Sequence, residues 1–175
     1  MLPRPFQQYL SISQMKNLIL TIALFTASFS AFAQAQRVQE NNDPFIKHQA
    51  DSLKALYAKD GFILLKEASI NMESEYEIPV VVPLTAGTWY QFVFIGEPTS
   101  KLYEVRMFDW SEKQVVYQKK MWGDVDGNII TYSYIPKITE YHMMRPVQVN
   151  KKKKKNLPGY VMMFKRTGAP VKETK

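Results

Sequence analysis

Short apolar segments separated by turn residues dominate this sequence and limit the folds open to it. From residue 88 onward such segments, rich in aromatic and β-branched side chains, recur at roughly the 8–12-residue spacing of sandwiches and barrels. They are TWYQFVFI (88–95), KLYEVRMFDW (101–110), KQVVYQKKMW (113–122), NIITYSYI (128–135), TEYHMMRPVQV (139–149) and GYVMMFKR (159–166). The pattern predicts a mainly β fold, an antiparallel, jelly-roll-like β-sandwich of about seven strands.

An alternating segment comes before these strands. From Ala68 to Leu84 apolar and polar side chains occupy alternate positions, which is typical of a half-buried strand. Pro79 and Pro83 cannot donate to a ladder, so the segment is either an edge strand or two strands joined at a bend near Ile78. Glu73, Glu75 and Glu77 are expected to share one strand face and to keep an edge from aggregating, with a calcium ligand set as the alternative.

One helix is predicted at the N-terminal side of the strands. Asp43 is a suitable N-cap, Pro44 fits the first helical position, and Gly61 is a natural stop. Apolar residues between Ile46 and Tyr57 recur every three or four positions, so one face of this helix is expected to pack on the sheet.

The start of the chain resembles an export signal. Lys16 precedes the apolar run 18–25, and Ala31-Phe32-Ala33 has the small residues that signal peptidase accepts, so cleavage is expected after Ala33. The run is short for a membrane anchor, which is the alternative. The expected location is therefore the periplasm, the extracellular space or the cell surface. The expected organisation is leader and signal peptide (1–33), linker (34–43), a single helix-plus-sandwich domain (44–167) and a flexible tail (168–175).

Several kinds of chemistry lack the residues they need. Cysteine is absent and there are two histidines, so the sequence predicts no disulfide, no metal site and no cofactor. No catalytic motif occurs, and no catalytic residue is assigned. Asp109, Glu112, Asp124 and Asp126 leave a weak carboxylate-based hydrolase as one alternative. The stretch around Asp124 and Asp126 lacks the spacing of a calcium loop, and Asp126-Gly127 is expected to form a hairpin turn.

Five consecutive lysines set the charge of the chain. Without residues 1–33, which contain Arg4, Lys16 and no acid, the net charge falls from +7 to +5, so Lys151, Lys152, Lys153, Lys154 and Lys155 account for all of it. Like charges repel and stay hydrated, which predicts the solvated tip of a hairpin. Contact with an anionic surface is the alternative; nucleic acid is not expected, because no aromatic side chains interleave with the lysines.

Three tryptophans lie near predicted strand ends and are the candidate ligand-binding residues. Trp89, Trp110 and Trp122 can stack on sugar rings or anchor a protein partner, or they can seal the ends of the core.

The middle of the chain resembles a known family. VPLTAGTWYQFVFIG, SKLYEVRMFD, YSYIP, TEYHMM and GYVMMF, within about residues 82 to 165, are similar to the bacterial pre-peptidase C-terminal type of secreted jelly-roll module. The resemblance implies a noncatalytic binding or maturation domain, sometimes with calcium. The expected function is thus an exported, noncatalytic binding or accessory protein of the bacterial envelope. Its partner is an unknown envelope protein or polysaccharide, and a carbohydrate-binding module using the tryptophans is the first alternative.

Overall fold

A computed structural model of the chain describes residues 43–125 and 127–168. The predicted leader, the linker before Asp43, Asp126 and the tail beyond Gly168 lie outside the described residues.

The predicted helix is confirmed as α2, which spans Pro44–Lys59. The Asp43 carboxylate caps it by accepting hydrogen bonds from the backbone N–H groups of Phe45 and Ile46. Gly61 follows with a φ of 78°, a left-handed conformation in which glycine carries no Cβ penalty. Within the described part of the chain, no helix has the length and apolar character needed to cross a membrane.

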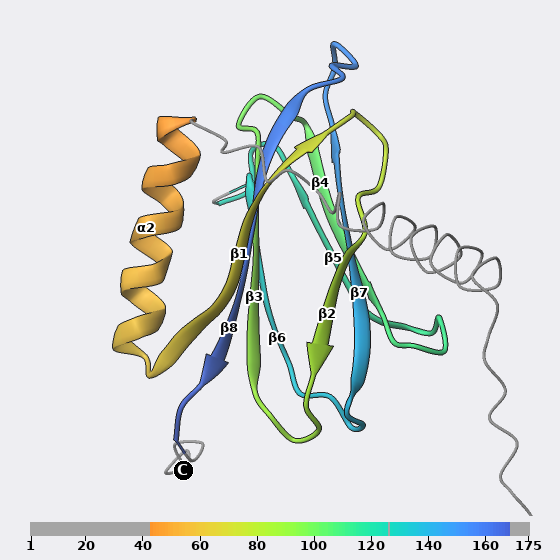
Figure 1. Cartoon of the computed structure of the whole chain (residues 1–175). Coiled ribbons are helices and arrows are strands. Elements are labelled where there is room, and N and C mark those ends of the chain that lie inside the picture. The colour runs from red at the N-terminus through yellow and green to blue at the C-terminus, as the bar shows by residue number, and fades with distance from the viewer. Residues whose placement is uncertain (1–42, 126, 169–175) are drawn as a thin grey trace, which may run out of the picture. The chain divides into compact units, whose positions relative to one another are not determined.

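The predicted sandwich is also confirmed, with eight strands rather than seven. They form two antiparallel four-stranded sheets, in the orders β1-β8-β3-β6 and β2-β7-β4-β5 (Figure 1). The strands are β1 (Phe62–Met72), β2 (Val80–Leu84), β3 (Tyr90–Gly96), β4 (Leu102–Phe108), β5 (Gln114–Met121), β6 (Ile129–Tyr134), β7 (Glu140–Val149) and β8 (Leu157–Arg166).

Most connections cross from one sheet to the other. Among the described strands, only β4 and β5 are both consecutive and hydrogen-bonded to each other. Two predicted hairpins are therefore wrong: β5 and β6 lie in different sheets, and so do β7 and β8. The lysine stretch is a link between sheets, and so is the connection that contains Gly127.

The alternating segment from Ala68 to Leu84 is two strands in different sheets. β1 ends at Met72 and β2 begins at Val80, so the bend predicted near Ile78 is a whole connection between sheets. Glu73, Glu75 and Glu77 fall in this connection, and Glu75 has a φ of 75°. The expectation that they share one strand face is wrong, because the sequence alternation continues past the point where the ladder stops.

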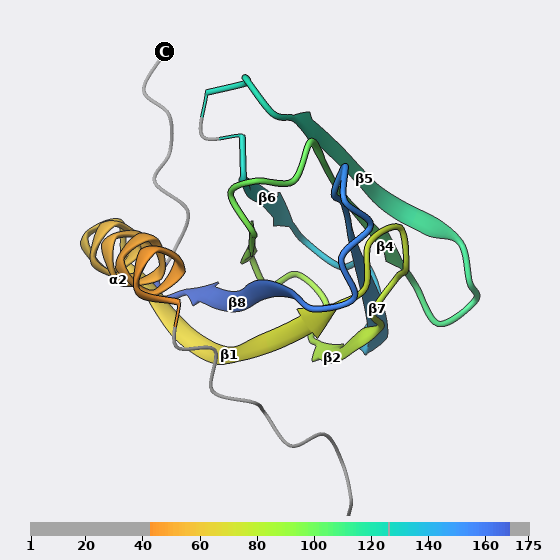
Figure 2. The same ribbon diagram turned by 90° about the horizontal axis from the view of Figure 1, so that it is seen from above.

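The two sheets differ in what lies on their outer faces. The main core fills the space between them, with Phe92, Phe94 and Tyr103 among its largest buried side chains. A second cluster lies on the other side of β3 and β8, where Ile46 and Ala50 of α2 are buried (Figure 2). We call β1-β8-β3-β6 the covered sheet. We call β2-β7-β4-β5 the open sheet, because the described residues place no helix on its outer face.

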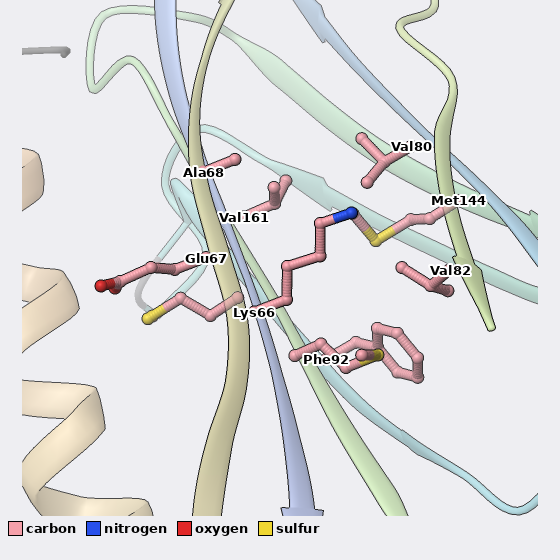
Figure 3. Close-up of a pocket in the computed structure, with 10 residues that line it drawn as sticks. Lys66, Glu67, Ala68, Val80, Val82, Phe92, Met144 and Val161 are labelled. Atoms are coloured by element: carbon pink, nitrogen blue, oxygen red, sulfur yellow. The ribbon is translucent and has the colours of Figure 1, made fainter. Parts of the chain in front are cut away.

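The edge strands β1 and β2 leave a small opening between the sheets. The register of β1 against β8 shifts between Leu64 and Lys66, and the Lys66 side chain points toward Val80 and Met144 of the open sheet (Figure 3). The cavity there is about 20 Å³, room for about one water molecule. An inward-pointing charge discourages pairing with another strand, so this opening protects an edge rather than holding a ligand.

Candidate functional site

The outer face of the open sheet carries rows of cross-strand neighbours. The alternation along β4 turns Glu104, Arg106 and Phe108 away from the core. The register aligns Val81 of β2, Met143 of β7 and Phe108 of β4 in one row. Arg145, Arg106 and Tyr117 form the next row. The strands of this sheet therefore bring together side chains that lie far apart in the sequence.

Two arginines stand side by side in the centre of this face. Arg106 and Arg145 are directly opposite in the register, a position where like charges repel. Glu77 offsets this repulsion, with Oε1 at 2.7 Å from Nη1 of Arg106 and Oε2 at 3.5 Å from Nη1 of Arg145. The Arg145 guanidinium also lies 4.6 Å from the centre of the Phe108 ring, a cation–π contact. Arg145 is thus held in a defined orientation.

A second carboxylate completes the network. Glu104 accepts a hydrogen bond from Nη2 of Arg106 at 3.0 Å and one from the Tyr117 hydroxyl at 3.3 Å. The hydrogen bond to Glu104 raises the pKa of Arg106, and the nearby charge of Glu77 adds to the increase. These contacts fix the polar groups of the face before any ligand arrives.

A hollow lies at one end of this face, beside an exposed aromatic pair. The rings of Trp110 and Tyr141 are 6.1 Å apart and inclined by 51°, and their residues are 70% and 54% exposed. The hollow has a volume of about 240 Å³, and we call it the Trp110 hollow. It is lined by Val81, Phe108, Asp109, Trp110, Glu112, Tyr141, His142, Met143 and Arg145.

A second hollow of about 390 Å³ shares Asp109 with the first. Tyr134 and Glu140 line it. Burial raises the pKa of Tyr134, and the carboxylates of Asp109 and Glu140 add to the increase. The Tyr134 hydroxyl lies 3.2 Å from Nε2 of the buried His142, so a polar contact joins one lining residue of each hollow. The two hollows are therefore neighbours at this end of the sandwich.

The three candidate tryptophans lie in three different places. Trp110 borders the Trp110 hollow. Trp89 packs edge-on against Phe62 at 5.9 Å and under the Arg166 guanidinium at 4.5 Å, and its buried Nε1 has no hydrogen-bond partner among the described residues. Trp122 is 72% exposed and follows the far end of β5, whose eight residues span about 26 Å. The three tryptophans therefore do not form one flat binding surface. Ligand contact by each of them remains a prediction.

The five lysines have different environments. Lys151, Lys152 and Lys155 are exposed and make no ion pair within the described residues. Lys154, however, lies 3.4 Å from a Glu97 carboxylate whose side chain is only 10% exposed, and Lys153 reaches Glu75 at 4.0 Å. All five lysines are exposed, as expected of a solvated loop, but Lys154 also pairs with Glu97, which was not expected.

The acids proposed for a hydrolase are divided between two ends of β5. Asp109 and Glu112 share the β4–β5 turn, where Oδ1 of Asp109 accepts the backbone N–H groups of Ser111 and Lys113. Asp124 follows the far end of β5 and accepts the N–H of Met121 at 2.7 Å. Over residues 43–125 and 127–168, no group of three or more acidic or histidine side chains is arranged to hold a metal ion.

Sequence reasoning found Trp110 and missed its neighbours. Tyr141, Phe108 and Arg145 come from two strands, β4 and β7, and only the register places them around Trp110. Alternation within TEYHMMRPVQV contained part of the information, because it assigns Tyr141, Met143 and Arg145 to one strand face. It does not say which strand lies beside them.

Comparisons with known proteins give a fold-level likeness and no family. No family model matches the chain, so the pre-peptidase resemblance stays a prediction, and no curated protein matches either. A cleaved adhesin domain of Lys-gingipain from Porphyromonas gingivalis is 12% identical over 58% of this chain and 74% of its own, with a TM-score of 0.38.

Two carbohydrate-binding structures resemble the chain to a similar degree. The CBM22-1 and GH10 modules of Clostridium thermocellum xylanase 10B, with xylohexaose, are 11% identical over 66% of this chain and 28% of theirs, with a TM-score of 0.35. TmCBM61 with β-1,4-galactotriose is 12% identical over 62% of this chain and 84% of its own, with a TM-score of 0.34. Likeness at this level carries no residue correspondence between these proteins and this chain.

Proposed function

We propose that this chain is an exported, noncatalytic binding protein that holds a neutral polysaccharide on the outer face of the open sheet. The observation that carries the proposal is the Trp110–Tyr141 pair, solvent-exposed and bordering a hollow of about 240 Å³. Apolar C–H faces of sugar rings stack on such rings, and the polar tip of tyrosine can hydrogen-bond a hydroxyl.

The polar lining of the Trp110 hollow suits hydroxyl groups. Arg145 offers donors that are fixed by Phe108 and Glu77, while Asp109 and Glu112 offer acceptors. A sugar hydroxyl can both donate and accept, so it satisfies either kind of group. Sites of this kind combine an apolar wall with a few placed polar groups, as this one does.

The charge of the hollow favours a neutral ligand over an acidic one. Two carboxylates, Asp109 and Glu112, face one guanidinium, that of Arg145. An acidic polymer would meet a net negative lining there, and like charges at close range oppose binding. A neutral chain meets no such penalty.

The arrangement of Asp109 and Glu112 favours binding of a sugar chain over its hydrolysis. Hydrolysis of a glycosidic bond needs two carboxyl groups on opposite sides of it. Asp109 and Glu112 lie in one short turn, and Asp109 is engaged in holding that turn. This arrangement supports binding of a sugar chain without cleavage.

The test is calorimetry and affinity electrophoresis of the full chain against soluble neutral polysaccharides such as xylan, galactan and glucan. We expect one of these to bind and Trp110→Ala to weaken its binding by at least about 2 kcal/mol, roughly thirtyfold. Trp122→Ala is the matched control, because it removes an equally exposed tryptophan from the far end of β5. Equal binding by wild type and Trp110→Ala would refute the proposed site, and no binding by the wild type would refute the ligand class.

A further inference from the structure

The end of the sandwich opposite the Trp110 hollow collects positive charge. The lysine loop, residues 150–156, joins β7 to β8 there (Figure 1). Lys101 and Lys120 lie at the same end, beside the loop's five lysines, whereas the described acids of this end are Glu73, Glu75, Glu97 and Asp124. Among the described residues, seven lysines against four carboxylates leave a surplus of three positive charges; Asp126, which lies outside them, is not counted.

The lysine loop is held at its base and turns tightly at its tip, where the Lys153 N–H donates to the Asn150 C=O at 3.0 Å. The buried Asn150 is held by Ser74, whose Oγ accepts the Asn150 N–H at 2.9 Å. The Asn150 side chain in turn accepts the N–H of Lys152 at 2.9 Å. The Lys154 ion pair with Glu97 ties down the returning arm. Because the base is ordered, binding through Lys151, Lys152 and Lys155 loses little further conformational entropy of the backbone.

Exposed apolar side chains stand beside these charges. Trp122 is 72% exposed, Val125 87% and Met121 51%. Backbone hydrogen bonds link Trp122 N–H to Lys101 C=O at 2.9 Å, and Lys101 N–H to Val149 C=O at 2.8 Å. Since neighbouring strands are about 4.8 Å apart, the Trp122 backbone lies about 10 Å from the base of the lysine loop.

We propose that this end of the sandwich, the lysine end, docks on an anionic lipid bilayer, with the lysines at the headgroups and Trp122 inserted at the interface. Clustered lysines are attracted to acidic headgroups, and tryptophan prefers the boundary between headgroups and hydrocarbon. A purely solvated loop does not explain three exposed apolar side chains beside it. A soluble acidic polymer would use the lysines but gain little from Val125 and Met121, which favours the bilayer.

The geometry also suits the proposed function without depending on it. The Trp110 hollow and the lysine end lie at opposite ends of β4 and β5. A chain docked through the lysine end therefore keeps the Trp110 hollow away from the bilayer and open to solution.

The test is co-sedimentation of the full chain with vesicles of phosphatidylcholine alone and of phosphatidylcholine mixed with phosphatidylglycerol. Lys151→Gln, Lys152→Gln and Lys155→Gln together remove the loop lysines that make no ion pair with a described residue, and leave Lys153 and Lys154 in place. We expect about 100-fold weaker binding to the anionic vesicles, because each lysine near such a surface contributes roughly a fivefold gain. Trp122→Ala is expected to weaken binding about tenfold. Added salt should weaken wild-type binding, because it screens the attraction of the lysines.

Matched controls separate the lysine end from the rest of the chain. Lys113→Gln with Lys137→Gln, and Trp110→Ala, remove charge and an indole at the opposite end and are expected to leave vesicle binding unchanged. The leader is identical in every variant, so differences between variants report on the sandwich alone. Circular dichroism verifies that each variant is folded.

Three results would overturn the proposal. The first is equal affinity for neutral and anionic vesicles. The second is unchanged vesicle binding by the triple lysine variant. The third is a protein that binds a soluble acidic polysaccharide but not anionic vesicles, and whose binding to the polysaccharide is not weakened by Trp122→Ala. That third result would assign the lysine end to a polyanion instead.

Discussion

The covered sheet and the open sheet use their outer faces differently. In the covered sheet, every residue of β3 is buried, because the core lies on one side and α2 on the other. In the open sheet, β4 alternates strictly between buried and half-buried positions. A strand buried on both faces contributes to stability on both, whereas a strand with one solvated face has side chains free for recognition.

This difference makes the open sheet the binding side of the protein. Its outer side chains can change without opening a cavity, so their identities are free to serve a ligand. The arginine pair with Glu77 and the exposed Trp110–Tyr141 pair have little to do with the core. Mutations on the two outer faces are therefore expected to have opposite consequences.

The largest expected effect is on the covered sheet. Phe164 is buried under α2, with its ring 5.0 Å from that of Tyr57. We expect Phe164→Ala to lower the free energy of unfolding by about 3–5 kcal/mol, measured by urea denaturation. Tyr141→Ala on the open sheet is the control, expected to change it by less than about 0.5 kcal/mol. Similar losses in the two variants would contradict the distinction between the faces.

The next effect concerns the link between the sheets. Asn150 is buried and bonded to Ser74 and to the N–H of Lys152. We expect Asn150→Ala to cost about 1–3 kcal/mol of stability, because buried polar partners lose their hydrogen bonds. Lys151→Ser with Lys152→Ser, in the same loop, is expected to cost less than about 0.5 kcal/mol. A larger cost for the lysine pair than for Asn150 would mean that the tip, and not the base, orders the loop.

A smaller, pH-dependent effect is expected where α2 meets the covered sheet. Glu67 accepts from Lys54 Nζ at 2.7 Å and from the Tyr160 hydroxyl at 2.7 Å. Burial acts to raise the pKa of Glu67, but these two hydrogen bonds outweigh it, so the pKa lies below its ordinary value of 4.5. The stabilisation is thus present above about pH 4.5 and is lost as the pH falls through the lower, folded-state pKa.

The measurement is the unfolding free energy of wild type and Glu67→Gln across acidic pH. We expect an advantage of up to about 1 kcal/mol for wild type near neutrality, since the pair is partly exposed. That advantage should vanish on acidification. An advantage that grows as the pH falls would have the wrong sign for a carboxylate of lowered pKa.

The smallest effect on stability is expected in the centre of the open sheet. Arg145→Gln removes a guanidinium that lies on Phe108 and 3.5 Å from Glu77, while Glu77 keeps Arg106. Thermal denaturation is expected to show a change in unfolding free energy within about 0.5 kcal/mol. Affinity electrophoresis is expected to show weaker binding of the polysaccharide. A large loss of stability would show that Arg145 supports the fold.

Local patterns in the sequence predicted much of this fold. Asp43 and Pro44 marked the start of α2, and Gly61 marked its end, because caps depend on neighbouring residues. Each of the six late segments became a strand, since period-two patterning reflects burial on one side.

Strand partners were not predictable in the same way. Asp126-Gly127 and the lysine stretch suggested hairpins by local turn chemistry, yet the strands they join belong to different sheets. Alternation says which side of a strand is buried but not which strand lies beside it. The candidate site depends on this missing information, because Phe108 and Tyr141 reach Trp110 only through the pairing of β4 with β7.

The binding role of the open sheet is tested most directly by an NMR titration of the full chain with short oligosaccharides cut from the neutral polysaccharide that binds it. We expect chemical-shift changes confined to the outer face of the open sheet, at Val81, Phe108, Trp110, Tyr141 and Arg145, with Trp89 and Trp122 unchanged. Changes centred on Trp89 or Trp122, or spread over the covered sheet, would contradict this role.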